Sequence, residues 1–314
     1  SLKRFAGEDS VYVQIAEYTI NHRMEDILED IYRRKPDVIA FSCYIWNWEM
    51  VQKIVTELHK LLPELPIWLG GPEVSFDAGE ILDKYPQLSG IMVGEGEAVF
   101  SELLSYYLYR DRQLRDIAGL ALRDGFTGER KPLDMSAIPF LYDNAADFQN
   151  RILYYESQRG CPFRCSYCLS SIDKTVRLRD IGVVKQELQF FLDNKVKQVK
   201  FVDRTFNCNH EHAMEIWRYI LEHDNGFTNF HFEIAGDRLE DEEAALLARM
   251  RPGQVQLEIG VQTTNKRTLK EIRRETDFAK LKAAVENIRK AGNIHQHLDL
   301  IAGLPYEDYE SFGR

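Results

Sequence analysis

Three cysteines that lie close together are the residues best suited to carry chemistry. Residues 160–168 read GCPFRCSYC, which places Cys161, Cys165 and Cys168 in a loop directly after an expected strand. Such a loop can turn all three sulfurs toward one centre, and thiolates are the usual ligands of iron–sulfur clusters. Because the sequence has no fourth cysteine nearby, one iron of a four-iron cluster would stay open for a substrate or cofactor.

A structural zinc site is the alternative interpretation of these cysteines. Structural zinc takes four ligands, usually as two close pairs. The candidates for the fourth ligand are Cys208 and the pair His210 and His212. Side chains two positions apart on a helix do not face each other, so this pair is poorly spaced to share a metal ion. The triad therefore favours a cluster, with zinc as the second hypothesis.

Charge and composition narrow the class of protein. The chain of 314 residues carries 40 Lys and Arg against 50 Asp and Glu, a net charge of −10. This balance disfavours nucleic acid as the main partner, because phosphate binding needs a basic surface. No apolar run approaches the roughly 20 residues of a membrane helix. With five cysteines, an odd number, and no signal peptide, we expect a cytoplasmic protein without a disulfide framework.

The first part of the chain alternates strands and helices, which predicts a flavodoxin-like, doubly wound α/β sheet. The expected strands are Val11–Glu17, Asp37–Cys43, Pro66–Gly70 and Gly90–Gly94, and the expected helices are Arg23–Arg34, Trp48–Leu62, Ala78–Lys84 and Glu97–Tyr109. Residues 113–150 are irregular apart from a small hairpin at Gly119–Gly125. We therefore divide the chain into a first domain at 1–112, a linker with a small hairpin at 113–150 and a second domain at 151–314.

The second part predicts a partial (β/α) barrel, with about five of the eight units of a closed barrel. The expected strands are Ile152–Gln158, Gln198–Asp203, Asn229–Ala235, Gln254–Gln262 and His295–Ala302, and the expected helices are Gly182–Asn194, Glu211–His223, Asp241–Met250 and Phe278–Ala291. The cysteine loop follows the first of these strands. It therefore lies at the strand end where such barrels keep their chemistry.

Polar side chains occupy one face of several barrel strands. Along Gln254–Gln262 the side chains alternate between faces, and Gln256, Glu258 and Gln262 share one face while the other is aliphatic. The same alternation places further polar side chains on this face: His231, Glu233, His295, His297 and Asp299. The aliphatic face must pack on helices, so the polar face should look into the barrel, where it binds something. A mutually satisfied polar network without catalysis is the alternative.

The CxxxCxxC motif, with Tyr167 before the last cysteine, resembles the signature of the radical S-adenosylmethionine (SAM) superfamily. The resemblance implies that the three cysteines hold a 4Fe-4S cluster, whose open iron chelates the amino and carboxylate groups of SAM. Reductive cleavage of SAM then gives a 5′-deoxyadenosyl radical. Further stretches match in order, namely VDRT at 202–205, GVQT at 260–263 and IAGLP at 301–305. The SAM-binding residues implied by the resemblance are Tyr167, Asp203, Glu233, Gln262, Arg274 and Gly303.

A flavodoxin-like sheet ahead of such a barrel resembles the cobalamin-dependent branch of that superfamily. The stretches FSC at 41–43, GGPEVS at 70–75 and VGEGE at 93–97 follow expected strands, at the edge where doubly wound sheets bind ligands. The cobalamin-binding residues implied are Ser42, Gly70, Gly71, Ser75 and Gly94. Tyr44, Trp46 and Trp48 are candidates to lie against the corrin, with ordinary core contacts as the alternative. Because no DxHxxG motif is present, we expect no histidine below the cobalt.

The resemblance implies an enzyme with three cofactors: a 4Fe-4S cluster, SAM and cobalamin. The expected reaction is methylation of an unactivated carbon in an unknown substrate, with an external electron donor such as flavodoxin or ferredoxin. The alternatives are radical cyclisation or rearrangement, as in anaerobic porphyrin-ring oxidative cyclases, and a non-catalytic cobalamin- or metal-binding module. The intact triad and the polar barrel face argue against the module. The resemblance also places the first sheet strand ahead of this sequence and the end of the barrel beyond it.

Overall fold

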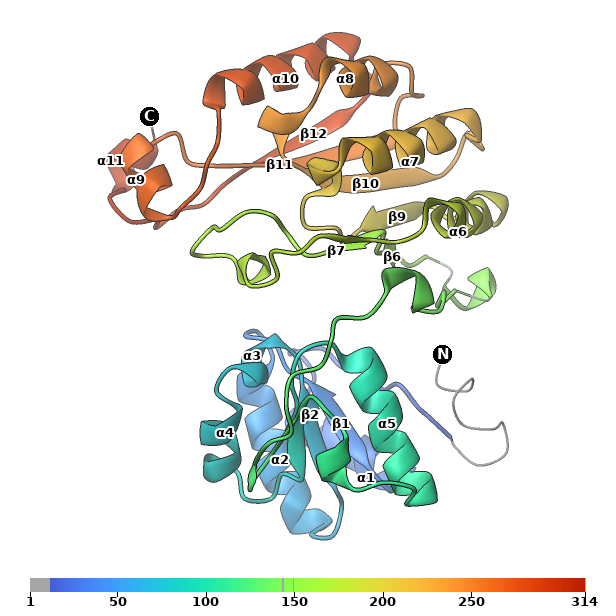
Figure 1. The fold of residues 1–314 in the computed structure, drawn as a ribbon, viewed down its shortest axis with the longest axis vertical. Coiled ribbons are helices and arrows are strands. Elements are labelled where there is room, and N and C mark those ends of the chain that lie inside the picture. Colours follow the sequence, from blue (N-terminus) through green and yellow to red (C-terminus); the bar gives the residue numbers. More distant parts are fainter. Residues whose placement is uncertain (1–11, 143, 149, 314) are drawn as a thin grey trace. The chain divides into compact units, whose positions relative to one another are not determined.

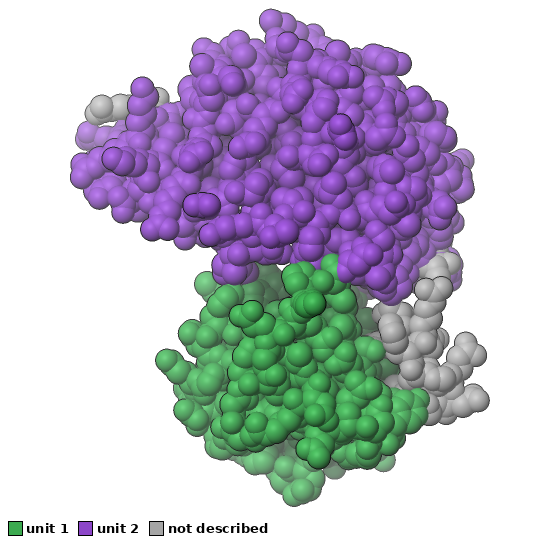
Figure 2. Space-filling model, in the orientation of Figure 1, with its two compact units in different colours: residues 1–133 green, residues 134–314 purple. Residues whose placement is uncertain are grey.

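The computed structural model describes residues 12–142, 144–148 and 150–313. The chain forms two compact units, residues 1–133 and 134–314, which are coloured separately in Figure 2. Each unit is built from strands and helices, as Figure 1 shows, so the α/β class is confirmed. No helix of the described residues is long and apolar enough to cross a membrane.

The first unit contains a five-stranded sheet in the order β1-β2-β3-β4-β5. Strands β1 to β3 are parallel, while β4 pairs antiparallel with β3 and β5 with β4. Residues Ile67, Trp68 and Leu69 of β2 are fully buried, as in parallel strands covered on both faces. The elements are α1 (Met24–Arg34), β1 (Ile39–Ser42), α2 (Trp48–Leu61), β2 (Ile67–Gly70), α3 (Pro72–Ser75), α4 (Ala78–Lys84), β3 (Gly90–Met92), α5 (Gly96–Tyr109), η2 (Leu114–Asp116), β4 (Leu120–Leu122) and β5 (Gly125–Phe126).

The division between the two units lies inside the segment 113–150 that was expected to be a linker. The hairpin β4–β5 is present as expected, but β4 pairs with β3 and so extends the first sheet. Arg130 also forms an ion pair with Glu102 of α5, at 2.5 Å between Nη2 and Oε2. Of the expected linker, residues 113–133 belong to the first unit and residues 134–150 to the second.

The strand expected at Val11–Glu17 is wrong for the residues that the structure describes; Val11 lies outside them. Residues 12–17 form no ladder with another strand and are mostly exposed. A cavity of about 1270 Å³ is lined both by residues 12–20 and by β1. A strand forms only where its backbone bonds to that of a neighbouring strand. Because the cavity lies between residues 12–17 and β1, the two backbones form no ladder.

The second unit contains a parallel five-stranded sheet in the order β12-β11-β10-β9-β6 and a small antiparallel pair, β7–β8. Its helices α6, α7, α8 and α10 follow one another along the sheet (Figure 1). The elements are η3 (Met135–Ala137), η4 (Ala145–Phe148), β6 (Leu153–Tyr155), β7 (Gln158–Arg159), η5 (Leu169–Ser171), β8 (Arg177–Leu178), α6 (Ile181–Asp193), β9 (Gln198–Phe201), η6 (Phe206–Cys208), α7 (His210–Glu222), β10 (Asn229–Ile234), η7 (Gly236–Arg238), α8 (Asp241–Leu247), β11 (Val255–Gln262), α9 (Lys266–Glu271), α10 (Phe278–Ala291), β12 (His295–Leu300) and α11 (Tyr309–Phe312).

The predicted division of the barrel strands into a polar and an apolar face is confirmed. In β11 every second residue from Val255 to Val261 is buried, and the residues between them are half-buried. The buried set shares one core with helix residues such as Leu188 and Trp217. The polar side chains therefore lie on the face away from the helices. The edge strand β12 departs from the rule, since Leu298 and Leu300 are about half exposed.

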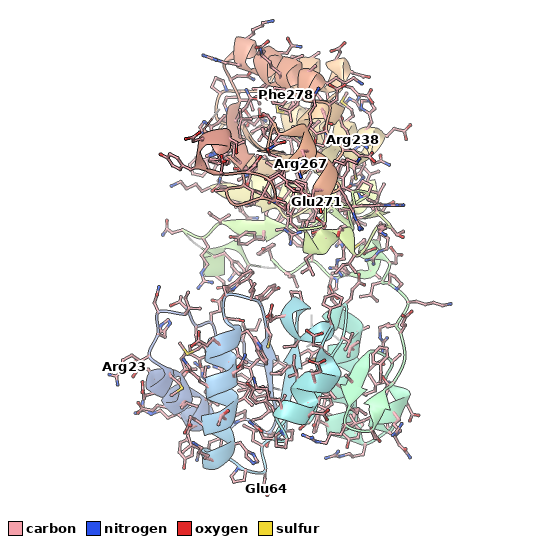
Figure 3. All side chains as sticks on the ribbon, turned by 90° about the vertical axis from the view of Figure 1, so that its left-hand side faces the viewer. Arg23, Glu64, Arg238, Arg267, Glu271 and Phe278 are labelled. Carbon is pink, nitrogen blue, oxygen red and sulfur yellow. The ribbon has the colours of Figure 1, made fainter. Side chains whose placement is uncertain are left out.

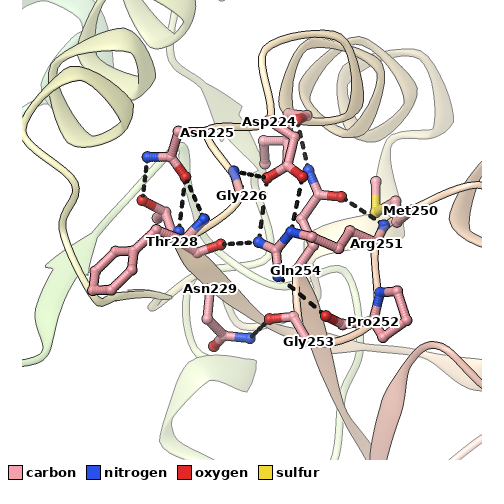
Figure 4. A network of polar contacts seen from close by, with 12 residues as sticks. Asp224, Asn225, Gly226, Thr228, Asn229, Met250, Arg251, Pro252, Gly253 and Gln254 are labelled. Atoms are coloured by element: carbon pink, nitrogen blue, oxygen red, sulfur yellow. Dashed lines mark hydrogen bonds and ion pairs between the residues drawn. The ribbon is translucent and has the colours of Figure 1, made fainter.

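A polar network joins the loops that precede β10 and β11 (Figure 4). Arg251 donates from Nε to Asp224 Oδ2 at 2.9 Å and from Nη2 to Asp224 Oδ1 at 3.2 Å. Its Nη2 also reaches the carbonyl oxygen of Thr228 at 3.3 Å. These loops enter the strands at their N-terminal ends, the side of a β/α barrel that serves stability rather than ligand binding.

We expect Arg251→Ala to lower the free energy of unfolding by about 1–2 kcal/mol, because it removes charged hydrogen bonds that are partly exposed and so partly screened. Urea denaturation of the protein without cofactors measures this. Arg249→Ala is the matched control, since Arg249 is exposed, and it should leave the midpoint unchanged. Equal midpoints for the two variants would contradict the assignment.

Candidate cluster and cofactor sites

The cysteine loop leaves β7 and is tied down by backbone hydrogen bonds. Cys161 N donates to Asp173 O at 2.9 Å, which closes the loop on its own far end. Cys168 N donates to Cys165 O at 3.1 Å, which forms a tight turn within the motif. These bonds fix the path of the chain between the three cysteines without using their sulfurs.

Two further features hold the cysteine loop in place: a glycine at its start and a cation–π contact. Gly160 has φ +100°, and a side chain there would collide with the carbonyl of Thr175, so the residue before Cys161 must be glycine. The guanidinium of Arg238, labelled in Figure 3, lies 4.8 Å from the ring centroid of Phe163. This cation–π contact connects the loop to the turn that follows β10.

The three motif cysteines differ in burial but are all free. Cys161 and Cys165 are buried and Cys168 is half-buried, and no cysteine is in a disulfide. Among the described residues, no three His, Cys, Asp or Glu side chains converge on a position for one metal ion. That finding concerns single ions, such as zinc. A four-iron cluster is larger, and its ligands need not converge on one point.

Arg274 joins the cysteine loop to the end of β11. Its Nη1 lies 3.8 Å from Cys165 Sγ and 3.4 Å from the Tyr167 hydroxyl, and its Nη2 donates to the Gly260 carbonyl at 2.5 Å. Its Nε is buried and has no hydrogen-bond partner among the described residues. Burial raises the pKa of Tyr167 to about 12, so the phenol keeps its proton at neutral pH. The residues here fit an anionic cofactor group, because the Arg274 guanidinium is positively charged and the residue is only half-buried.

The end of β11 is shaped by Gly260 and Gln262. Gln262 has φ +67°, and its amide folds back over Gly260, where any side chain would collide with it. Ile301 N donates to Gln262 O at 3.0 Å, which brings the turn containing Gly303, at φ +86°, to this end of the strand. Of the predicted SAM residues, the structure thus brings together Tyr167, Gln262, Arg274 and the Gly303 turn.

Asp203 differs from its predicted position at the SAM site. Its carboxylate is fully buried and accepts from Ser157 N at 2.8 Å, from Gln158 N at 3.2 Å and from the Ser157 hydroxyl. Burial raises its pKa to about 7. Both oxygens are used to join β9 to the β6–β7 corner, so Asp203 supports the strand that leads to the cysteines instead of presenting a free carboxylate.

Thr205 is a residue that the sequence analysis did not single out. Its Oγ1 lies 3.5 Å from Cys161 Sγ, and its carbonyl accepts from Gln158 Nε2 at 2.7 Å. The sequence feature that could have identified Thr205 is its place in the VDRT stretch, which directly follows β9. Cys208, the candidate fourth zinc ligand, lies nearby with Sγ 3.4 Å from Gln158 Nε2.

Glu233 belongs to a charged group on the polar barrel face. Lys200 Nζ lies 3.7 Å from Glu233 and 3.3 Å from Glu258, whose carboxylate lies 2.9 Å from His231 Nε2. Burial, followed by the charge of Glu258, raises the pKa of Glu233. These side chains neutralise much of one another's charge. A mutually satisfied polar network without catalysis, the alternative given above, therefore explains part of the polar face.

The pair of histidines on β12 also lies on this face. His295 and His297 approach to 2.9 Å between their Nε2 atoms, so one ring donates and the other accepts. Burial raises the pKa of Asp299, and the charge of Glu258 adds to the effect. His210 instead is half-buried beside Glu240 and Glu243 at the start of α8, with Nδ1 3.2 Å from the buried Glu243 carboxylate.

In the first unit, the C-terminal ends of β1 and β2 approach each other closely. Gly71 has φ +107°, and a Cβ there would come within 2.5 Å of the Cys43 carbonyl. Glu73 N donates to the same carbonyl at 3.3 Å, and the Ser75 hydroxyl donates to Gly71 O at 2.8 Å. Ser42 ends β1 and Gly94 follows β3, so both belong to the same C-terminal edge of the parallel strands. Such an edge fits a flat macrocycle, because main chain can approach it without side chains in the way.

The three aromatic residues after β1 separate into two groups. Tyr44 and Trp46 stack at 4.5 Å with nearly parallel rings, and both are exposed. Trp48 instead begins α2 and meets Tyr85 edge-on at 6.1 Å, within the core of the unit. Tyr44 and Trp46 therefore remain candidates for contact with a corrin, whereas Trp48 takes the structural role that was its alternative.

Comparison with known proteins finds similar enzymes. The chain is 26% identical over 312 residues to the cobalamin-dependent radical SAM methyltransferase TokK of Streptomyces tokunonensis, covering 88% of this chain and 44% of TokK. It is 22% identical to the anaerobic magnesium-protoporphyrin IX monomethyl ester cyclase of Cereibacter sphaeroides, covering 99% and 53%. The chain thus spans about half the length of these relatives.

A solved structure shares the fold. The radical SAM methyltransferase TsrM from Kitasatospora setae, with cobalamin and a [4Fe-4S] cluster bound, matches with a TM-score of 0.72 at 18% identity, covering 91% of this chain and 60% of TsrM. The family model for the B12 binding domain matches residues 1–104 and supports the expected cobalamin. The radical SAM superfamily model matches residues 155–314, just over half of the chain. On that match the protein belongs to the radical SAM superfamily, whose cofactors are a 4Fe-4S cluster and SAM.

Proposed function

We propose that this protein is a cobalamin-dependent radical SAM enzyme that methylates an unactivated carbon. The observation that carries the proposal is the contact of Arg274 with Cys165 and Tyr167 at the end of β11. This contact joins the cysteine motif to Arg274, although Cys165 and Arg274 lie far apart in the sequence. The match to TokK, which is named as a methyltransferase, favours methyl transfer.

Each proposed role falls on residues that the structure describes. Cys161, Cys165 and Cys168 would hold the cluster. Tyr167, Gln262, Arg274 and the turn at Gly303 would bind SAM, and Glu233 is a further proposed contact on the polar face. In the first unit the proposed cobalamin residues are Ser42, Gly70, Gly71, Ser75 and Gly94. Asp203 is removed from the SAM set, because its carboxylate is buried and occupied.

When bound, the cluster supplies an electron to SAM, and cobalamin supplies the methyl group. The chain's own residues bind and orient these groups. The phenol of Tyr167 stays protonated and can donate a hydrogen bond, because its pKa is raised to about 12. Enzymes of this superfamily need a reductant, and flavodoxin or ferredoxin is the donor we propose. All five cysteines are free, in keeping with a cytoplasmic enzyme whose thiols stay reduced.

The proposal is tested with SAM that carries a trideuterated methyl group. The protein is reconstituted anaerobically with iron, sulfide and cobalamin and incubated with this SAM and a chemical reductant. Methyl transfer predicts both 5′-deoxyadenosine and deuterated methylcobalamin. Release of 5′-deoxyadenosine without deuterium in the cobalamin would favour cyclisation or rearrangement, the chemistry of the cyclase relative. Formation of neither product would leave a binding module.

Cobalamin bound to this protein is expected to have no histidine ligand. We expect the visible spectrum of bound cobalamin to be unchanged in His22→Ala and His59→Ala. His22 Nδ1 accepts from Thr19 N at 2.9 Å, and His59 lies in the last turn of α2, away from the C-terminal strand ends. Gly71→Ala, which would strike the Cys43 backbone, should lose binding while far-UV circular dichroism reports a folded protein. A spectral change in either histidine variant would contradict the assignment.

A further inference from the structure

The guanidinium of Arg274 touches a cysteine that the proposed function assigns to the cluster. Its Nη1 lies 3.8 Å from Cys165 Sγ, within the range of a hydrogen bond to sulfur, while Nη2 is held by the Gly260 carbonyl at 2.5 Å. A basic residue that served only a cofactor carboxylate would have no need to face a thiolate. Two of the three nitrogens are thus already used by the protein itself.

The position of this guanidinium is set by the backbone around it. Arg274 N donates to Leu269 O at 3.0 Å, which fixes the turn after α9. Ser166 N, next to Cys165 in sequence, donates to Ile272 O at 2.9 Å, so the cysteine loop is joined to the same turn. These two backbone hydrogen bonds hold the turn that carries Arg274 against the cysteine loop.

A fixed positive charge beside a ligand sulfur changes the potential at which the cluster accepts an electron. One-electron reduction adds a negative charge to the cluster, and a nearby cation stabilises the more negative state. Hydrogen bonds to the ligand sulfurs and the net charge around them set the potentials of iron–sulfur clusters. Arg274 supplies both effects at Cys165. Exposed Arg273, one residue earlier, has the same charge but no contact with a sulfur among the bonds of the structure.

We propose that Arg274 is a positioning residue that acts through Cys165 to raise the reduction potential of the cluster, whether or not SAM is bound. This inference rests on the proposed function, since it requires the cluster. The step concerned is the transfer of one electron from an external low-potential donor to the oxidised cluster. No bond forms or breaks in it, and no proton moves.

The test measures the midpoint potential of the cluster in the reconstituted protein without SAM. The protein is titrated with titanium(III) citrate, and electron paramagnetic resonance reports the fraction of reduced cluster. We expect Arg274→Gln to lower the equilibrium constant for one-electron reduction at least tenfold, a shift of about 59 mV to more negative potential. Arg274→Lys keeps the charge but loses the planar set of donors, so a smaller shift is expected. Arg273→Gln is the matched control and should keep the wild-type potential.

The outcomes separate this inference from the proposed function. Wild-type potentials in every Arg274 variant that assembles a cluster would overturn the inference. Weaker SAM binding in those variants would then show that Arg274 serves the cofactor alone, and the proposed function would stand. A shift in midpoint potential for Arg273→Gln as large as that for Arg274→Gln would also overturn the inference. It would show that the potential depends on the net charge of the protein rather than on the contact between Arg274 and Cys165. If the wild-type protein assembles no cluster, both fail together.

Discussion

Replacing Cys165 by alanine is expected to abolish both the bound iron and the cleavage of SAM. The motif supplies three thiolates, and Cys165 is the buried middle one, so its loss leaves two ligands for a cluster that requires at least three from the protein. After anaerobic reconstitution, the wild-type protein should be brown and hold about four irons per chain. The variant should be colourless, and analysis of iron, sulfide and 5′-deoxyadenosine measures both effects.

Cys208→Ala is the matched control for the cysteine prediction. Cys208 is a free, half-buried thiol that lies beside Gln158, near the motif. We expect it to keep the iron content and the colour of the wild-type protein. Equal losses in both variants would favour the four-ligand zinc site, for which Cys208 is a candidate. Cleavage of SAM that survives in Cys165→Ala would defeat the cluster assignment.

The second large effect is expected at Asp203. Asp203→Ala should lower the free energy of unfolding by about 3 kcal/mol, because the buried backbone N–H groups of Ser157 and Gln158 lose their acceptor and unsatisfied buried donors cost roughly 1–3 kcal/mol each. Chemical denaturation of the protein without cofactors measures the change. Asp203→Asn is the matched control, since its amide oxygen can still accept both N–H groups. Equal losses in the two variants would contradict this role.

The same carboxyl gives stability a defined pH dependence. Burial raises the pKa of Asp203 from its ordinary value of 3.8 to about 7, so the folded protein binds this proton more tightly than the unfolded chain. The resulting stabilisation is complete below about pH 4 and is lost as the pH rises through about 7. Denaturation curves at several pH values should show this fall in the wild type and a flatter profile in Asp203→Asn. A wild-type profile no steeper than that of the variant would contradict it.

Much of the fold follows from periodicity in the sequence. The alternation in Gln254–Gln262 predicts which face of β11 meets the helices, and Phe278–Ala291 matches α10 residue for residue. Short elements were not predictable in this way. Helix α9 has six residues and depends on the Asn265 side chain, which caps the N–H groups of Arg267 and Thr268. Its apolar pattern is too short to distinguish it from a loop.

The site was predictable where chemistry is encoded by spacing and not where it depends on long-range contacts. The cysteine spacing alone indicates a cluster. The sequence could not separate Arg273 from Arg274, whereas the structure gives Arg273 a left-handed backbone and an exposed side chain and directs Arg274 to Cys165. The role of Asp203 was missed because its partners Ser157 and Gln158 lie on another strand, and burial is set only when the sheet forms.

The proposed function requires a cluster that binds SAM at its open iron. The most direct test is electron–nuclear double resonance of the reduced, reconstituted protein with SAM isotopically labelled in its carboxylate and amino groups. We predict hyperfine coupling to both labels, arising from one iron of a four-iron cluster, and its loss in Cys165→Ala. A protein that takes up a single zinc ion instead, or a cluster that shows no coupling to either label, would contradict the account.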